Sequence, residues 1–302
     1  MSRVWRGVLA ALLLGLAFSA NVVAATGRAE CNSLPSKILA RGVPYCVLLP
    51  PSYDTDKTRR YPVLYFLHGL GDNEQMFVHS GGMNLVEDLW ENHSIGEFLI
   101  VTPQGGTSFY INSQDGQRRY EDFLLQEFLP EMEKRYRAET GRGTRGVAGI
   151  SMGGYGALHL AFRHPQLFAA VAVHSAALLS KLPSVQAQQS PQIAGLERIL
   201  ANAFGSPFNA AYWNQNDPLR IVRTANLAGL KIYFDCGSAD DYGFEVGAEA
   251  LDKQLTLRHV PHEFHLYPGG HDWEYFAEHL PESLKSASKS LGSSPAQPGS
   301  SR

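Results

Sequence analysis

Short apolar runs alternate with longer segments of helical spacing along the chain. Apolar runs rich in Val, Leu, Ile, Tyr and Phe are typical of buried strands. They predict strands over residues 61–67, 98–101, 146–150, 168–173, 231–234 and 263–267. Between them, residues 121–137 place apolar side chains at intervals of three and four, as an amphipathic helix does, and we expect a kink at Pro130. Residues 153–163 form a second expected helix, which ends near Pro165.

This alternation predicts an α/β fold, in which a mostly parallel sheet carries helices on both faces. The chain has 302 residues, of which 44% are hydrophobic and 18% charged, so it can bury a full-sized core. The long stretch between the expected strands 168–173 and 231–234 predicts a small helical insertion and no large cap domain. The net charge is −3, and no block of like charges could follow a phosphate backbone, which argues against nucleic-acid binding.

The two ends of the sequence differ in composition from its middle. Arg3 and Arg6 precede the apolar run Val8–Phe18, and small residues follow it, as in an export signal peptide. Because the run is too short to span a bilayer, we expect residues 1–25 to be cleaved, with an uncleaved tether as the alternative. The mature protein is then expected in the periplasm or outside the cell, without membrane insertion. Residues 283–302 are rich in Ser and predict a disordered tail, which leaves residues 26–282 as one domain.

The sequence has three cysteines, too few for a disulfide scaffold, although export would allow one bridge. Cys46 and Cys236 lie in apolar runs and are expected to be buried in strands. A bridge between Cys31 and Cys46 is one possibility, which the sequence leaves open. A catalytic thiol is not expected.

The strongest chemical signal is the segment Gly149–Gly154, which lies between an expected strand and an expected helix. It contains G-x-S-x-G, in which the serine occupies a sharp, strained turn that side chains at the flanking glycines would obstruct. The hydroxyl of Ser151 would then stand at a helix N-terminus, where developing negative charge is favoured. We therefore expect Ser151 to be a nucleophile.

A serine nucleophile needs a base, usually a histidine oriented by a carboxylate, and in this fold both follow the serine along the chain. His271 lies on a glycine-rich loop after the last expected strand and is the expected base. The carboxylate should follow the strand 231–234, where the sequence offers Asp240 and Asp241. Asp240 is the first choice, but spacing alone does not separate these neighbours.

Two backbone N–H groups are needed to stabilise the oxyanion of the tetrahedral intermediate. One belongs to the residue after the nucleophile, Met152, and the other comes from the loop after an early strand. The segment His68–Gly71 follows the strand 61–67, so the second donor is assigned to the N–H of Leu70. His68 itself is expected to be structural.

Two other patterns suggest a metal or a cofactor, but their contexts do not fit. His259, His262 and His265 resemble a zinc cluster, yet a short strand would point them to alternating faces. Residues 141–146 match G-x-G-x-x-G but precede a strand instead of following one, so the helix N-terminus that would hold a pyrophosphate is missing. We expect neither a metal nor a cofactor.

Several segments occur in the order found in one protein family: Leu49–Asp54 before Tyr61–Val63, His68–Gly71, Gly149–Gly154, Cys236–Asp241 and Gly269–Trp273. Over about residues 40–280 the chain resembles the esterase D, S-formylglutathione hydrolase and feruloyl esterase-like family of the α/β-hydrolase superfamily. The resemblance implies an α/β-hydrolase fold and no cofactor. It also implies a triad of Ser151, Asp240 and His271, with the amides of Leu70 and Met152 as the oxyanion hole.

The resemblance and the leader together predict an exported serine carboxylesterase that acts on small or aromatic acyl esters, small-molecule or carbohydrate-linked. The S-formylglutathione hydrolases are usually cytosolic and tend to carry Ser-Gly-Leu-Thr where this chain has His68–Gly71, so that thioesterase activity is the less favoured alternative. An acyltransferase with the same triad and an alcohol acceptor is another. A peptidase would need a large cap, and a binding module would be expected to lack a triad member. The residues expected to contact substrate are Tyr110, Asn112, Trp213 and Trp273.

Overall fold

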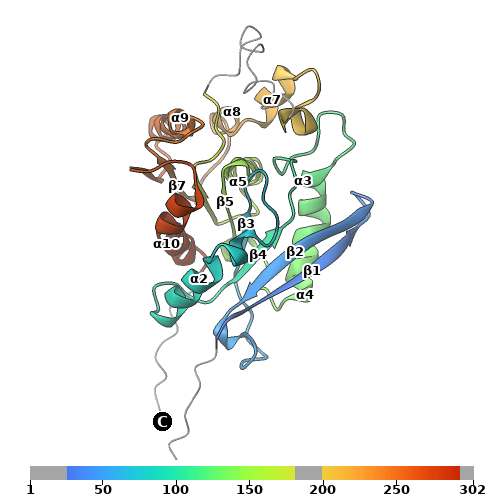
Figure 1. The fold of residues 1–302 in the computed structure, drawn as a ribbon, viewed down its shortest axis with the longest axis vertical. Coiled ribbons are helices and arrows are strands. Elements are labelled where there is room, and N and C mark those ends of the chain that lie inside the picture. The colour runs from blue at the N-terminus through green and yellow to red at the C-terminus, as the bar shows by residue number, and fades with distance from the viewer. Residues whose placement is uncertain (1–25, 181–198, 293–302) are drawn as a thin grey trace, which may run out of the picture.

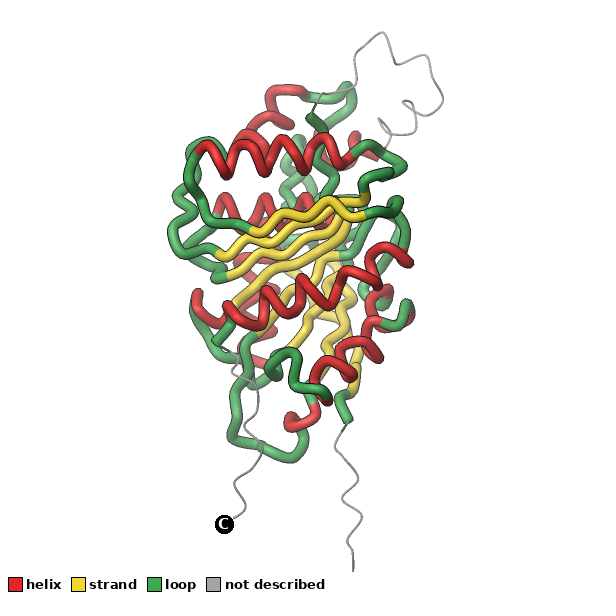
Figure 2. The backbone as a smooth tube through the Cα atoms, turned by 90° about the vertical axis from the view of Figure 1, so that its left-hand side faces the viewer, coloured by secondary structure: helices red, strands yellow, loops and turns green. Residues whose placement is uncertain are grey.

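The computed structural model describes residues 26–180 and 199–292, and it contains one eight-stranded sheet flanked by helices (Figures 1 and 2). The strand order is β1-β2-β4-β3-β5-β6-β7-β8. The strands are β1 (Arg28–Ser36), β2 (Arg41–Leu49), β3 (Val63–Leu67), β4 (Leu99–Pro103), β5 (Arg145–Ile150), β6 (Ala170–His174), β7 (Lys231–Gly237) and β8 (Glu263–Tyr267). Strands β3 to β8 are parallel, whereas β1 and β2 form an antiparallel hairpin at one edge. The prediction of a mostly parallel sheet is confirmed.

Helices cover both faces of this sheet (Figure 2). They are α1 (Met76–His79), α2 (Gly82–Glu91), α3 (Tyr120–Phe123), α4 (Leu129–Arg135), α5 (Met152–Arg163), α7 (Ala210–Asn216), α8 (Pro218–Ile221), α9 (Phe244–Leu257) and α10 (Trp273–Ser290). Successive side chains of a strand point to opposite faces. In β3, accordingly, Tyr65 packs in the core on the side of α5 and α9, while Leu64 and Phe66 pack in the core on the side of α2 and α10.

The helix predicted over residues 121–137 is present but divided. Helix α3 leads into a π-helical segment, Leu124–Phe128, and α4 follows directly. The irregularity therefore begins before Pro130, where the kink was expected. Pro130 has no N–H to donate to a carbonyl of the preceding turn, and it lies in the first turn of α4, where that loss is tolerated.

The prediction of a disordered tail from residue 283 is wrong for its first part, because α10 continues to Ser290. Leu284, Ala287 and Leu291 are buried, and together with Leu280 they form an apolar stripe against the sheet. Ser283 is buried too, and its hydroxyl donates to the carbonyl of Leu280 at 2.9 Å. The serine-rich composition therefore concealed a helix whose buried face carries few but regularly spaced apolar residues.

The insertion between β6 and β7 is helical in its described part, where α7 and α8 pack next to α5 (Figure 1). Residues 1–25, 181–198 and 293–302 lie outside the described residues, so the predicted signal peptide and the end of the predicted tail are not part of this description. Within the described ranges, no helix is long and apolar enough to cross a membrane.

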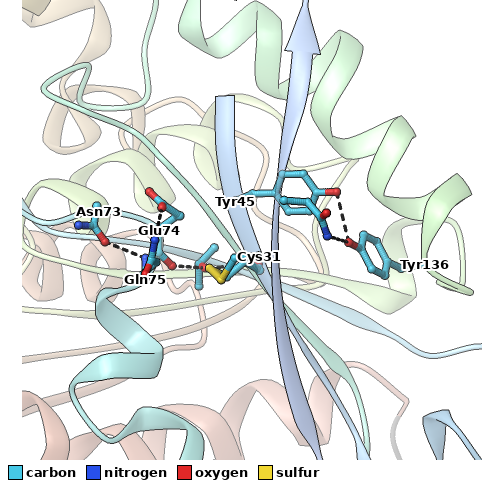
Figure 3. The surroundings of a disulfide bond; sticks show 9 residues. Cys31, Tyr45, Asn73, Glu74, Gln75 and Tyr136 are labelled. Carbon is cyan, nitrogen blue, oxygen red and sulfur yellow. Dashed lines mark hydrogen bonds between the residues drawn. A yellow bond between two sulfur atoms is a disulfide. The ribbon is translucent and has the colours of Figure 1, made fainter. Parts of the chain in front are cut away.

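The two strands of the edge hairpin are joined by a disulfide. Cys31 and Cys46 are direct partners in the register of β1 and β2, and they form the bridge that the sequence left open (Figure 3). Cys236, the third cysteine, is free and buried in β7. The strand β1 is largely exposed on both faces and therefore has little buried surface to hold it in place. The bridge attaches it covalently to β2, which is mostly buried.

Replacing both Cys31 and Cys46 by serine is expected to lower the free energy of unfolding by about 3 kcal/mol, because the bridge closes a loop of about 15 residues in the unfolded chain. Urea denaturation of the double variant and the wild type measures the difference. A reducing agent should destabilise the wild type and leave the variant unchanged. Equal stabilities of wild type and variant would contradict the prediction.

Candidate active site

Ser151 occupies a strained turn between β5 and α5. Its φ of +52° and ψ of −118° lie outside the regions that ordinary residues favour. The turn is possible because its neighbours are glycines: a Cβ at Gly153 would lie 1.9 Å from the carbonyl oxygen of Leu67, and a Cβ at Gly149 would lie 2.6 Å from the carbonyl carbon of Gly153. The N–H of Ser151 donates to the carbonyl of His174 in β6 at 3.0 Å. Packing against β3 and β6 thus fixes the turn at the N-terminus of α5.

Asp240 and His271 come together at the carboxyl ends of β7 and β8. Oδ2 of Asp240 accepts a hydrogen bond from Nδ1 of His271 at 2.7 Å, and Oδ1 accepts from the N–H of Tyr242 at 3.0 Å. The thiol of Cys236 donates to the same Oδ2 at 3.6 Å. Burial disfavours the charged carboxylate, but the hydrogen bond and charge of His271 outweigh it and hold the pKa of Asp240 below its usual value.

The neighbouring carboxylate, Asp241, has a different partner. It is exposed, and its Oδ2 accepts from the backbone N–H of His271 at 3.2 Å. Of the two carboxylates that the sequence offered, the structure therefore pairs Asp240 with the imidazole and Asp241 with the backbone of the same loop.

Aromatic rings enclose the imidazole of His271. Tyr242, Phe244 and Phe276 meet it edge to face, with ring centroids 4.8, 5.4 and 5.3 Å away. The side chain of His271 is only 8% exposed. With Nδ1 bound to Asp240 and three rings around it, the imidazole is held in one orientation.

The loop after β3 lies against the serine turn. A Cβ at Gly69 would lie 3.6 Å from Cβ of Ser151, so the two backbones approach closely. His68 anchors this loop: Nδ1 lies 2.7 Å from the carbonyl oxygen of Gly69, and Nε2 lies 2.8 Å from the amide nitrogen of Gly105. Burial lowers the pKa of His68, which favours the neutral ring that these two contacts require. This agrees with the structural role expected for His68.

These elements surround a cavity of about 410 Å³. Ser151 and His271 both line it, as do Leu70 and Met152, whose amides were the expected oxyanion donors. Its other walls are largely aromatic and aliphatic, and they include Phe109, Trp213 and Trp273. The cavity is therefore an apolar chamber with a serine and a histidine at its surface, as is usual for a site that binds a small organic ligand.

Comparison with known proteins gives the family. A family model described as "Putative esterase" matches residues 36–287. The chain belongs to this esterase family. It is 31% identical over 242 residues to Esterase Rv1288 of Mycobacterium tuberculosis (strain ATCC 25618 / H37Rv), an alignment that covers 74% of this chain and 51% of that protein. The chain thus spans about half the length of the curated relatives it matches first. The family predicted from the motifs is confirmed.

Solved structures show the same fold. A ferulic acid esterase is 28% identical, with a TM-score of 0.75 over 87% of this chain and 98% of its own. The S-formylglutathione hydrolase from Agrobacterium tumefaciens is 17% identical, with a TM-score of 0.71 over 89% of this chain and 97% of its own. The α/β-hydrolase fold expected from the sequence is therefore confirmed.

The four residues expected to contact substrate divide into two pairs. Trp213 and Trp273 line the cavity. Tyr110 does not: it is fully buried, and its hydroxyl donates to the carbonyl of His68 at 3.1 Å. Asn112 lies away from the cavity as well, where its Oδ1 accepts from the N–H of Asp122 at 3.1 Å. For these two the prediction is corrected, because both side chains support the loop that presents Phe109 to the cavity.

Two of the three histidines that resembled a zinc cluster contact other side chains of the protein. Nε2 of His262 contacts Oδ1 of Asp252 at 2.9 Å, and the ring of His265 stacks on Tyr267 at 5.2 Å. Within residues 26–180 and 199–292, no three His, Cys, Asp or Glu side chains are grouped so that they could hold a metal ion.

Sequence reasoning missed two charged residues of the cavity, Asp272, which is adjacent to His271, and Asp72. Asp72 follows directly on His68–Gly71, the motif that was singled out for its backbone donors. Its position beside that motif was the available signal.

Proposed function

We propose that the protein is a serine carboxylesterase that uses Ser151 as nucleophile, His271 as base and Asp240 as the carboxylate that orients the base. One observation carries the proposal: a strained serine at a helix N-terminus shares a cavity with a histidine whose Nδ1 is bound to a buried carboxylate. Nδ1 is engaged by Asp240, which leaves Nε2 to take the proton of Ser151.

In the proposed mechanism, Oγ of Ser151 attacks the ester carbonyl carbon while Nε2 of His271 takes its proton. The N–H groups of Leu70 and Met152 donate to the resulting oxyanion, each contributing roughly 3 to 4 kcal/mol. His271 then gives its proton to the leaving alcohol, and an acyl-enzyme forms on Ser151. Water, deprotonated by His271, hydrolyses this ester and regenerates the serine.

The cavity favours small or aromatic acyl groups. About 410 Å³ is near the lower end of the range for small-molecule sites, and rings such as those of Phe109, Trp213 and Trp273 offer flat apolar surface to an acyl chain or a phenyl ring. Similar proteins support the same substrate class, since they include an acetyl esterase of Caldicellulosiruptor saccharolyticus and a ferulic acid esterase.

We further propose that the protein is exported. The leader-like residues 1–25 are the main support. The Cys31–Cys46 disulfide is consistent with an oxidising compartment, since such bridges are rare in the cytosol.

Turnover of a series of p-nitrophenyl esters, from acetyl to long acyl, together with methyl ferulate, tests the proposal. We expect kcat/KM to peak at short or aromatic acyl groups and to fall at least tenfold for long chains, which exceed the cavity. A parallel reaction with added alcohol, analysed for free acid and new ester, separates hydrolysis from acyl transfer. If new ester is the main product, the proposed function changes from hydrolase to acyltransferase. If no ester is turned over, both functions are contradicted.

A further inference from the structure

The substrate cavity carries negative charge without a matching cation. Its charged side chains are Asp72, Asp272 and, when protonated, His271, and no lysine or arginine is among the described residues that line it. Asp272 already has a role, because its Oδ1 accepts from the N–H of Tyr275 and caps α10 at 2.9 Å. Asp72 is therefore the carboxylate in this cavity that remains available to act on a ligand.

Asp72 lies close to the reacting serine. It follows Gly71, whose φ is +87°, and its N–H donates to the carbonyl of Gly69 at 3.3 Å, so the loop turns back on itself. A Cβ at Gly69 would lie 3.4 Å from Oδ2 of Asp72 and 3.6 Å from Cβ of Ser151. Oδ2 therefore lies within about 7 Å of Cβ of Ser151, a distance at which charges in a partly dry site still interact strongly.

No lysine, arginine or histidine of the described chain forms an ion pair with Asp72. Partial burial raises the pKa of its carboxyl, as expected where an unpaired charge is poorly solvated. A second carboxylate brought into the cavity by a substrate would meet the charge of Asp72 and find no cation to offset it.

We infer that Asp72 is a specificity-determining residue that restricts the site to esters without negative charge near the scissile bond. The inference rests on the proposed function, whose substrate class it narrows to neutral or cationic esters. Repulsion from the like charge of Asp72 weakens the binding of an anionic ester, whereas it does not affect a neutral ester of the same shape.

Two matched pairs of esters test the inference, because the charge can lie on either side of the scissile bond. The p-nitrophenyl monoester of adipic acid is compared with p-nitrophenyl 6-oxoheptanoate, which replaces the carboxylate by an acetyl group. In the second pair, 4-acetoxybenzoate carries the charge on its leaving group, and 4-acetoxybenzamide is its neutral counterpart. For the wild type, kcat/KM should favour the neutral member of at least one pair by roughly tenfold or more. Asp72→Asn should reduce that preference to within about threefold.

Asp88→Asn is the matched control, because it removes the same charge from an exposed position on α2 that does not line the cavity. It should keep the wild-type preference. High salt should weaken the preference of the wild type and not alter Asp72→Asn. If Asp72→Asn keeps the wild-type ratio in both pairs, or if the wild type shows no preference in either, the inference is overturned.

A binding measurement keeps the inference separate from the proposed function. 4-Acetamidobenzoate and 4-acetamidobenzamide have the shapes of the second pair but an amide in place of the ester. Their affinities for Ser151→Ala, and for Ser151→Ala combined with Asp72→Asn, are compared by calorimetry. Tighter binding of the neutral compound to Ser151→Ala, and loss of this preference with Asp72→Asn, would support the role of Asp72 in excluding anionic ligands. This result would stand even if no ester were turned over, because absence of turnover would refute only the esterase activity. Equal binding of both compounds to Ser151→Ala would overturn the inference about Asp72.

Discussion

Replacing Ser151 by alanine is expected to lower kcat/KM for the preferred p-nitrophenyl ester by about 10⁴- to 10⁶-fold. The change removes only Oγ, so the attacking atom is lost while the backbone turn and its packing remain. The φ of +52° is no harder for alanine than for serine, because both carry a Cβ. Thermal unfolding should therefore occur within a few degrees of the wild type, and turnover is measured by release of p-nitrophenol.

Ser80→Ala is the matched control, since Ser80 is another serine that lines the same cavity. It should reduce kcat/KM by less than about tenfold, because no step of the proposed mechanism uses it. A Ser151→Ala variant that retains activity within tenfold of the wild type would remove this serine from the mechanism. In that case the strained turn would need another explanation.

Replacing Asp240 by asparagine is expected to lower kcat by about 10³- to 10⁴-fold. The amide keeps the shape of the carboxylate but cannot stabilise the positive charge that His271 gains, and its NH₂ group can present the wrong partner to Nδ1. The same substitution at Asp241 should cost less than about tenfold, because its carboxylate binds a backbone N–H and faces solvent. Single-substrate kinetics of the two variants at pH 7 measure both effects.

The two aspartate variants serve as controls for each other, since they remove the same charge from adjacent residues. The pKa of Asp240 is held below its usual value, so its carboxylate is ionised at the pH of this comparison. A larger loss for Asp241→Asn than for Asp240→Asn would contradict the pairing seen in the structure, and small losses for both would mean that neither orients the base.

Strands β3 to β7 were predictable because they are almost entirely buried and therefore read as apolar runs. Strand β8 is partly exposed and carries Glu263 and His265 among its apolar residues. Strand β1 was not predictable, because its exposed residues include charged and polar side chains, and its position depends on pairing with β2 and on the Cys31–Cys46 bridge. The end of α10 was missed for a related reason. Its apolar stripe contains few residues, Leu284, Ala287 and Leu291, and these are recognisable as a buried helix face only from their contact with the sheet.

The candidate site was predictable where backbone geometry constrains the sequence, as at Gly149 and Gly153 around Ser151. Spacing could not separate Asp240 from Asp241, since the choice depends on how the loop after β7 turns toward His271. Tyr110 was misjudged because its ring turns inward: a Cβ at Gly105 would lie 2.4 Å from it, so the ring fills the space that this glycine leaves. Loop residues carry no periodic pattern from which such a direction could be read.

The buried free thiol of Cys236 offers a way to measure local opening of the chain next to the proposed triad. The sulfur lies beside the carboxylate of Asp240 and is fully shielded from solvent in the folded chain. A thiol-specific reagent can reach it only when the end of β7 opens, so the labelling rate follows the local opening equilibrium of the segment that carries Asp240. The labelling rate of this one sulfur atom would thus measure how often the segment with Asp240 opens locally. The measurement needs no substrate and no unfolding of the rest of the molecule.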